Sequence, residues 1–316
     1  MMILVTGCAG FIGYHATRAL LERGDTVIGV DNFNDYYDTG LKEARITALG
    51  NQNKFTLHKI NIEDKPALAK LFAKNKFDAV CHLAAQAGVR YSLENPDVYI
   101  STNVAGTHNL FELAREHKVP KFILASSASV YGGNTKVPFS ETDAVDKPLS
   151  LYAATKRYNE LEAHAYHSLY GLNVYCLRFF NVIGTWGRPD QALYKFTKAI
   201  LADEQIDVYN NGEHKRDFTY VDDIAAGVLA AIDGCNGYEI INLGNHKPVD
   251  LEYFISLIEK SLGKTATKNY LPLQPGDVVE TYADNSKAKK LLGWQPSTNI
   301  EQGVEKFIEW YKSYGA

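Results

Sequence analysis

"VTGCAGFIG", residues 5–13, gives the first indication of the fold of this 316-residue chain. Its three glycines, Gly7, Gly10 and Gly13, stand between an apolar run and a segment with helical periodicity. Such a turn at a helix N-terminus exposes bare backbone N–H groups, which bind a pyrophosphate. A lone glycine triplet is weak evidence, so a tight turn without a ligand remains the alternative.

An acidic residue follows at the spacing that a dinucleotide site requires. Asp31 lies 18 residues after Gly13, at the end of the run "TVIGV". Its carboxylate would accept hydrogen bonds from an adenosine ribose and repel a 2′-phosphate. The pair of features therefore predicts NAD as the cofactor rather than NADP.

Short β-branched runs alternate with helix-length segments over much of the chain. They are "MILVT", "TVIGV", "KFTLHKI", "DAVCHLA", "KFILASS", "NVYCLRF" and "YEIINLG". This alternation predicts an α/β fold with a Rossmann-type doubly wound parallel sheet. Later stretches rich in Gly and Pro predict a smaller C-terminal substrate-binding lobe. We expect an NAD-binding domain at 1–180 plus about 218–243, and a substrate domain at about 181–217 and 244–316.

Composition and charge narrow the class of protein. The net charge of -4 and the scattered lysines do not favour a nucleic-acid partner. We find no apolar stretch near the roughly 20 residues of a membrane span, and no signal peptide. The four cysteines lie far apart and show no metal-ligand spacing, so we expect reduced thiols, no metal and a cytoplasmic location.

A second motif, "SLYAATK" at residues 150–156, places Tyr152 four residues before Lys156. Spacing alone decides nothing, because Tyr194 and Lys198 repeat it. Only Tyr152 opens a helix one loop after a predicted strand that ends in serines, the last of them Ser127. Strand C-termini and helix N-termini face the cofactor crevice in such sheets.

This setting suits a general base. A free phenol has a pKa near 10, and a base for neutral pH needs one nearer 7. The ammonium of Lys156 on the same helix face and the positive nicotinamide ring would lower the phenol pKa. Ser127 would hold the substrate hydroxyl and relay its proton. The alternative is that Tyr152 and Lys156 only pack an ordinary helix.

These residues resemble the extended short-chain dehydrogenase/reductases, and most closely the nucleotide-sugar 4-epimerases of the UDP-glucuronate type. The resemblance covers nearly the whole chain. It is carried by "VTGCAGFIG", "DNFNDYYDTGLKEAR", "HLAAQAGVRYSLENP", "SSASVYG", "YAATK", "WGRPD", "RDFTYVDDI" and "QPGDVVETYAD". The glycine and Tyr-Lys motifs mark the superfamily, and "AQAGVRYSLENP", "WGRPD" and "QPGDV" mark the epimerases.

The resemblance implies an NAD-dependent 4-epimerase that acts through a 4-keto intermediate. Its catalytic residues would be Ser127, Tyr152 and Lys156. The expected cofactor-binding residues are Gly7, Gly10, Phe11, Ile12, Gly13, Asp31, Asn32, Asn61, Ile62, Leu83, Ala84, Ala85, Tyr152 and Lys156. The expected substrate-binding residues are Arg90, Ser127, Ser129, Asn181, Arg188, Tyr209, Arg216, Gln274 and Asp277. Arg216 would clamp the diphosphate, and Asp277 would bind the uridine ribose.

Two departures bear on the reaction and the sugar. The stretch "SSASVYG" has no acidic residue, which argues against the eliminations of related dehydratases and decarboxylases. Ala128 and Asn181 stand where UDP-glucuronate epimerases place hydroxyls around the sugar carboxylate. Gln274 instead matches the glucuronate type. We expect UDP-glucuronate and UDP-galacturonate as substrates, with a neutral UDP-hexose or an N-acetylhexosamine as the alternative and a non-catalytic NAD-binding regulator as the third possibility.

The resemblance also implies an assembly and a role. In related enzymes the helices near residues 97–117 and 152–170 pair into a four-helix dimer interface, so we expect a homodimer. The product class implies polysaccharide biosynthesis. The aromatic segment "FNDYYD" at 33–38 either lines the mouth of the cofactor cleft or packs a loop, and the sequence does not decide between the two.

Overall fold

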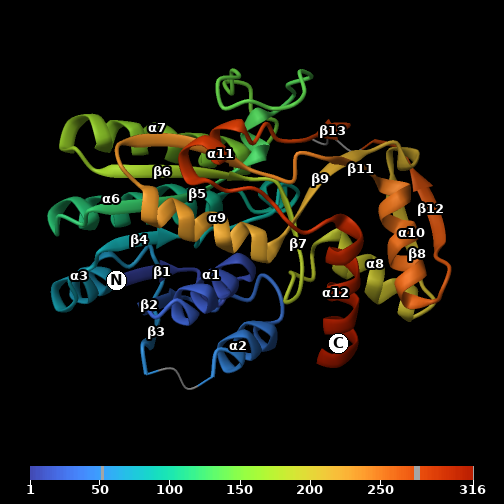
Figure 1. Cartoon of the computed structure of the whole chain (residues 1–316), viewed down its shortest axis with the longest axis horizontal. Helices are drawn as coiled ribbons and strands as arrows, with labels where there is room; N and C mark the ends of the chain where they lie inside the picture. Colours follow the sequence, from blue (N-terminus) through green and yellow to red (C-terminus); the bar gives the residue numbers. More distant parts are fainter. Residues whose placement is uncertain (51–52, 274–277, 316) are drawn as a thin grey trace.

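Seven parallel strands form the main sheet of the computed structural model, which describes residues 1–50, 53–273 and 278–315 (Figure 1). Their order is β10-β6-β5-β4-β1-β2-β3. The strands are β1 (Met2–Thr6), β2 (Thr26–Asp31), β3 (Phe55–Lys59), β4 (Ala79–His82), β5 (Lys121–Ser127), β6 (Asn173–Phe179) and β10 (Tyr238–Leu243). Each strand coincides with one of the seven β-branched runs, which confirms the predicted doubly wound sheet.

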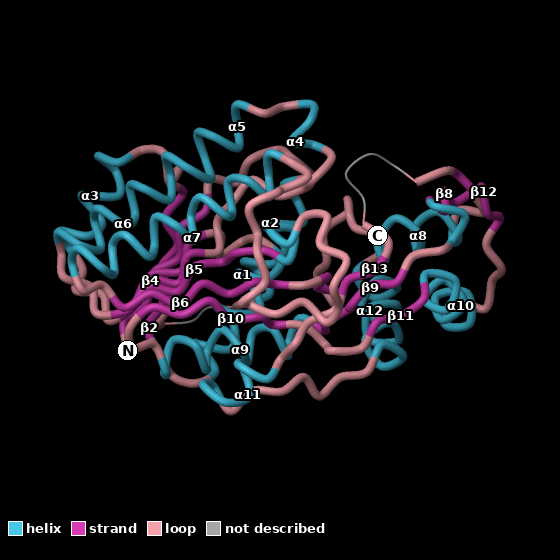
Figure 2. The backbone as a smooth tube through the Cα atoms, turned by 90° about the horizontal axis from the view of Figure 1, so that it is seen from above, coloured by secondary structure: helices cyan, strands magenta, loops and turns pink. Residues whose placement is uncertain are grey.

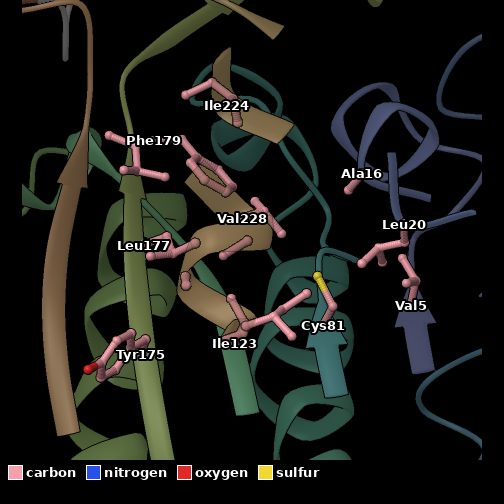
Figure 3. Close-up of a cluster of buried hydrophobic side chains, with 14 of the residues drawn as sticks. Val5, Ala16, Leu20, Cys81, Ile123, Tyr175, Leu177, Phe179, Ile224 and Val228 are labelled. Atoms are coloured by element: carbon pink, nitrogen blue, oxygen red, sulfur yellow. The ribbon is translucent and has the colours of Figure 1, made fainter. Parts of the chain in front are cut away.

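Helices cover both faces of this sheet, as Figure 2 shows from above. One apolar cluster joins the strands to α1 (Phe11–Glu22), α9 (Val221–Gly234) and α11 (Ser286–Leu292). A second cluster on the other face joins them to α3 (Lys65–Lys74), α6 (Thr107–Glu116) and α7 (Leu151–Tyr170). Figure 3 shows side chains of the first cluster between α1, α9 and the strands. Burial of apolar surface on two faces is what a parallel sheet needs.

Short elements complete this half of the chain. They are α2 (Thr39–Ala48), α4 (Tyr91–Glu94), α5 (Asp97–Tyr99), the π-helix η1 (Ile100–Gly106) and the 3₁₀ turn η2 (Ala128–Tyr131). Among the described residues, no helix is both long and apolar enough to cross a lipid bilayer.

The helix that carries the Tyr-Lys motif has defined ends. The Ser150 side chain accepts a hydrogen bond from the Ala153 backbone N–H at 3.1 Å, which caps the N-terminus of α7. Gly171 ends the helix in the left-handed conformation, with φ of +69°. These two caps fix where Tyr152 enters the helix.

Smaller sheets build the remaining lobe on the right of Figure 1. A four-stranded sheet contains β7 (Asn181–Ile183), β9 (Lys215–Tyr220), β11 (Pro248–Asp250) and β13 (Glu280–Thr281), and a two-stranded sheet contains β8 (Gln205–Tyr209) and β12 (Thr267–Leu271). The helices α8 (Ala192–Leu201), α10 (Leu251–Leu262) and α12 (Ile300–Tyr314) pack a third apolar cluster, and η3 (Asn210–Gly212) follows β8. Ser286–Leu292 falls in the predicted substrate range but packs against α9 and β10. The domain boundaries themselves stay a prediction.

A buried carboxylate ties this lobe together. Asp217 on β9 is fully buried and accepts hydrogen bonds from the backbone N–H groups of Asn245, His246 and Ala283 at 2.5 to 3.0 Å. Burial raises its pKa to about 6, and these bonds oppose the shift. Two separate segments, at residues 245–246 and at 283, are therefore bound to one side chain of β9.

Replacing Asp217→Ala should lower the free energy of unfolding by about 3 kcal/mol, because buried backbone N–H groups lose their acceptor. Urea denaturation followed by circular dichroism measures this change. Asp203→Asn serves as the control, because that carboxylate is 80% exposed in its pair with Lys264 and asparagine tolerates the backbone φ of +57° at this position. Equal effects of the two substitutions would contradict the role of Asp217.

Candidate active site

A large cavity opens at the carboxyl ends of the main-sheet strands. Its volume is about 1370 Å³ when the space open to solvent at its mouth is included. All of the expected cofactor-binding residues line it, together with Ser127, Asn181 and Arg188. The fold therefore gathers the predicted residues from segments far apart in the chain into one space, although their individual roles stay a prediction.

The floor of the cavity is bare backbone. Gly7 has a φ of +72°, and a Cβ at this position would lie 2.7 Å from the Ala84 nitrogen. A Cβ at Gly13 would lie 1.9 Å from the Gly7 carbonyl oxygen. Only glycine allows β1, β4 and α1 to meet here, and the free N–H groups at the start of α1 suit a pyrophosphate.

The ribose end of the expected site is also pre-formed. The Asp31 carboxylate accepts hydrogen bonds from the Ala9 N–H at 3.1 Å and the Phe33 N–H at 2.9 Å. A carboxylate has about four lone-pair sites, so Asp31 keeps acceptor capacity toward the cavity that it lines. The glycine turn and this carboxylate together fit a dinucleotide with a free 2′-hydroxyl.

Tyr152, Ser127 and Lys156 lie on the same cavity wall. The Lys156 ammonium donates a hydrogen bond of 2.8 Å to the Ala125 carbonyl on β5 and is almost fully buried. The Tyr152 ring packs edge-on against Tyr99, with the ring centroids 6.1 Å apart. The arrangement holds a phenol, a hydroxyl and an ammonium at the edge of one cavity.

The electrostatics differ in one respect from the expectation. Burial raises the pKa of Tyr152, whereas a hydrogen bond with Ser127 and the Arg188 charge oppose that rise. Burial also lowers the pKa of Lys156 to about 8, against the opposing charge of Glu160. Lys156 is not among the described groups that lower the Tyr152 pKa, and the effect of burial on this pKa exceeds the effects of Ser127 and Arg188.

A buried ion pair lies behind the part of the cavity that Ser127, Tyr152 and Lys156 line. Glu160 and Arg178 form two hydrogen bonds of 2.8 Å, and both side chains are essentially without solvent exposure. The Ser126 hydroxyl donates to the same carboxylate at 2.7 Å. Ser126 precedes Ser127, and Glu160 lies one turn after Lys156, so the pair fixes β5, β6 and α7 relative to one another.

The π-helix η1 adds a further support that the sequence did not reveal. The Asn103 amide donates to the Gln86 carbonyl at 3.0 Å and to the Thr155 hydroxyl at 3.1 Å. Asn103 also accepts from the Gln86 N–H at 2.8 Å. It therefore joins the loop after β4 to the helix of Tyr152.

Arg188 lines the first cavity, and the other expected substrate-binding residues separate into three groups. Ser127, Ser129, Asn181 and Arg216 line a second cavity that shares Ser127 and Asn181 with the first. Arg90 lies over the Tyr209 ring at 4.6 Å, and neither residue is among those lining the two cavities. Gln274 and Asp277 lie outside the described residues.

The loop after β2 contributes residues that the sequence left open or missed. Tyr36 and Tyr37 line the cavity, which decides the question left by "FNDYYD". Lys42 also lines it, almost fully buried, and donates to the Asn34 carbonyl at 2.7 Å. The sequence does contain a signal for this: Lys42 and Arg45 are two basic residues three apart on α2, and so lie on one face of that helix.

Arg188 is oriented by a neighbouring carboxylate. Its Nε and Nη2 atoms donate to Asp190 at 2.9 and 2.8 Å. The Tyr36 hydroxyl donates to the same carboxylate at 3.3 Å. The guanidinium is therefore held in a fixed direction at the cavity, since a bidentate pair restricts its rotation.

Comparisons with known proteins agree with this geometry. Residues 4–307 match the family described as GDP-mannose 4,6 dehydratase. A UDP-glucuronate 4-epimerase of Thermodesulfobacterium geofontis is 46% identical over 98% of this chain and 95% of its own length. The crystal structure of a UDP-glucuronic acid 4-epimerase from Bacillus cereus with UDP-glucuronic acid and NAD superposes with a TM-score of 0.94, at 36% identity over 99% of this chain and 100% of that one. A UDP-glucose 4-epimerase from Thermotoga maritima superposes with a TM-score of 0.91, at 32% identity over 100% of both chains.

The match over nearly all of the chain, together with the glycine turn and the Tyr-Lys wall, shows that this protein belongs to the GDP-mannose 4,6-dehydratase family of extended short-chain dehydrogenase/reductases and, within it, to the nucleotide-sugar epimerases.

Proposed function

We propose that this protein is an NAD-dependent 4-epimerase that interconverts UDP-glucuronate and UDP-galacturonate. The observation that carries the proposal is the common cavity of Tyr152, Ser127 and Lys156 above the glycine turn. The similarity to UDP-glucuronate 4-epimerases over 98% or more of the chain supports the substrate class.

Tyr152 acts as the general base in this proposal. It takes the proton of the hydroxyl on carbon 4 of the sugar, with Ser127 holding that hydroxyl and relaying the proton. The glycine turn, Asp31 and Lys156 would hold NAD, which would supply the acceptor and later the donor of the hydride on this carbon, and a positive charge that favours the ionised phenol. The 4-keto sugar turns over between the two transfers, so the second transfer reaches its other face.

The remaining residues hold ligands. Asp31 binds the adenosine ribose, and the glycine turn binds the pyrophosphate of the cofactor. Lys156 holds the nicotinamide ribose. Its charge helps to lower the pKa of the Tyr152 phenol when the cofactor and the sugar fill the cavity. Arg216 clamps the UDP diphosphate, because a guanidinium fork suits phosphate oxygens.

A second substrate class is favoured by two observed residues. Ala128 and Asn181 line the second cavity and offer no hydroxyl to a sugar carboxylate. Each lost hydrogen bond to a charged group costs roughly 1.5–3 kcal/mol. Arg188 and Ser129 are the groups that compensate in our proposal, and without that compensation a neutral UDP-hexose would be the better substrate.

A panel of UDP-sugars tests the function directly. Purified protein is incubated with UDP-glucuronate, UDP-galacturonate, UDP-glucose or UDP-N-acetylglucosamine, and the 4-epimers are separated by chromatography. We expect the two uronates to reach the same equilibrium mixture while the neutral sugars remain unconverted. Faster conversion of a neutral sugar would select the alternative, and bound NAD without any conversion would indicate a regulator.

The Tyr152→Phe variant tests the assigned base. The phenyl ring keeps the contact with Tyr99, so NAD should stay bound, while turnover should fall by at least about a hundredfold because proton transfer loses its base. Single-time-point conversion and the NAD content of the purified variant measure both effects. Tyr158→Phe on the exposed side of the same helix is the control. Activity of Tyr152→Phe within a few fold of the parent would refute the assignment.

We also propose that the protein is a homodimer that works in the cytoplasm and supplies polysaccharide synthesis. An apolar stripe along α7 supports the dimer: Tyr158, Leu161 and Leu169 are 43%, 55% and 71% exposed. Large apolar side chains in a row on one helix face are typical of an interface. The four buried free cysteines are compatible with a reducing compartment.

Charge on this stripe should separate the subunits. The double substitution Leu161→Glu with Leu169→Glu is expected to shift the mass in solution from two chains to one, 35.2 kDa, because carboxylates would be buried without partners. Light scattering after size exclusion measures the mass. Leu291→Glu, at a 38% exposed site on α11, should leave it unchanged. A parent protein that elutes as one chain would contradict the dimer.

A further inference from the structure

Arg45 on α2 is a fully buried arginine that contacts three segments around the cavity. Its Nη1 atom donates to the Ala9 carbonyl at 2.9 Å, inside the glycine turn. Its Nη2 and Nε atoms donate to the Trp186 carbonyl at 2.7 and 3.2 Å. Nη1 also donates to the Tyr37 hydroxyl at 2.6 Å. One side chain thus joins the nucleotide turn to the loop that carries Arg188.

The energetics make a purely space-filling role a poor explanation. No ion pair among the described residues contains Arg45, and burial lowers its pKa. Burying a cation away from water costs several kcal/mol unless its donors are satisfied. Here the donors are satisfied by carbonyl and hydroxyl oxygens that belong to different segments. The stabilisation is present only while those segments keep their relative positions.

The segment on the far side of Arg45 is conformationally demanding. Trp186 has a φ of +61°, which is uncommon for a residue with a side chain. The preceding carbonyl, that of Thr185, accepts from His15 Nε2 at 2.9 Å, and His15 is fully buried on α1. Two buried side chains of the nucleotide half therefore hold successive carbonyls of this loop.

This loop is part of the ligand cavity. Arg188 and Gln191 line the cavity two and five residues after Trp186. Ordering of the loop by a UDP-sugar would strengthen the Arg45 hydrogen bonds to Trp186, and those bonds hold the guanidinium against the Ala9 carbonyl of the cofactor turn. Two sites are coupled in binding free energy when occupancy of each one changes the contacts of a side chain that both share.

We propose that Arg45 is a positioning residue that couples cofactor binding at the glycine turn to UDP-sugar binding at loop 184–191, so that occupancy of one site strengthens the other. The inference rests on the proposed function only for the identity of the two ligands. A coupling of this kind retains the cofactor while a UDP-sugar is bound. Retention matters at that stage because the oxidised sugar must be reduced again by the same cofactor.

The test measures retention of bound NAD by the purified holoenzyme, with and without saturating UDP. NAD remaining on the protein is followed over time in NAD-free buffer after desalting. In the parent we expect UDP to slow the loss of NAD by about tenfold, within the usual range of coupling between sites. In Arg45→Met, which keeps volume but has no donors, the ratio of the two loss rates should fall close to one.

Two further variants separate coupling from general damage. Arg45→Lys keeps the charge but offers one compact ammonium that does not span the Ala9 and Trp186 carbonyls, so its ratio should lie between those of the parent and Arg45→Met. Arg23→Met removes an arginine paired with Asp25 and Asp233 and should keep the parent ratio. If Arg45→Met does not fold, as judged by circular dichroism, Arg45→Lys decides.

A parent ratio of one, or a parent-like ratio in the Arg45 variants, would overturn the proposal. Faster NAD loss in Arg45→Met with an unchanged ratio would show a structural role only. The measurement uses UDP and NAD without turnover, so it remains decisive even if the protein epimerises none of the tested sugars. Where turnover is measurable, Arg45→Met should raise KM for the UDP-sugar more than it lowers kcat.

Discussion

The missing Cβ at Gly13 is the constraint on which the nucleotide half of this structure depends. A Cβ would meet the Gly7 carbonyl oxygen at 1.9 Å, so any other residue would push α1 away from the turn. The helix position is also fixed by its buried face, where Ala16 and Leu20 pack in the first apolar cluster. Apolar packing and the close backbone contact therefore require the same position of α1. The bare backbone that lines the cavity results from this position.

The other side of the cavity, formed by β5 and α7, is held in position by a buried ion pair rather than by close backbone contact. Glu160 and Arg178 are buried together, and each charge alone would cost several kcal/mol in that place. The bidentate geometry and the Ser126 hydroxyl offset this cost only if β5, β6 and α7 keep their register. Lys156 reaches the Ala125 carbonyl in the same register. The position of the expected base is thus a consequence of a buried ion pair that never touches the cavity.

Sequence patterns predicted the parts of this protein that local chemistry determines. The seven strands were predicted because runs of β-branched residues are local signals. The glycine turn and Asp31 were predicted because a bound dinucleotide fixes the spacing between them. Arg45 and Asn103 were missed because their partners lie far away in the chain, at Trp186 and at Gln86 and Thr155. The direction of the Tyr152 pKa shift also needed burial, which no spacing reveals. The roles assigned to Gln274 and Asp277 fall outside the described residues.

The charge around the cavity bears on which sugar it accepts. Of the residues lining it, Lys42, Lys156 and Arg188 are cationic and Asp31 is the one carboxylate, a balance that suits two diphosphate ligands. Arg188 is nevertheless already paired with Asp190, so its charge is not freely available to a sugar carboxylate. A uronate gains from Arg188 only through the guanidinium edge that Asp190 does not use, whereas a neutral hexose needs no such contact. Discrimination therefore depends on how much of the Arg188 charge the bidentate pair with Asp190 leaves for the substrate, as well as on the absence of hydroxyls at Ala128 and Asn181.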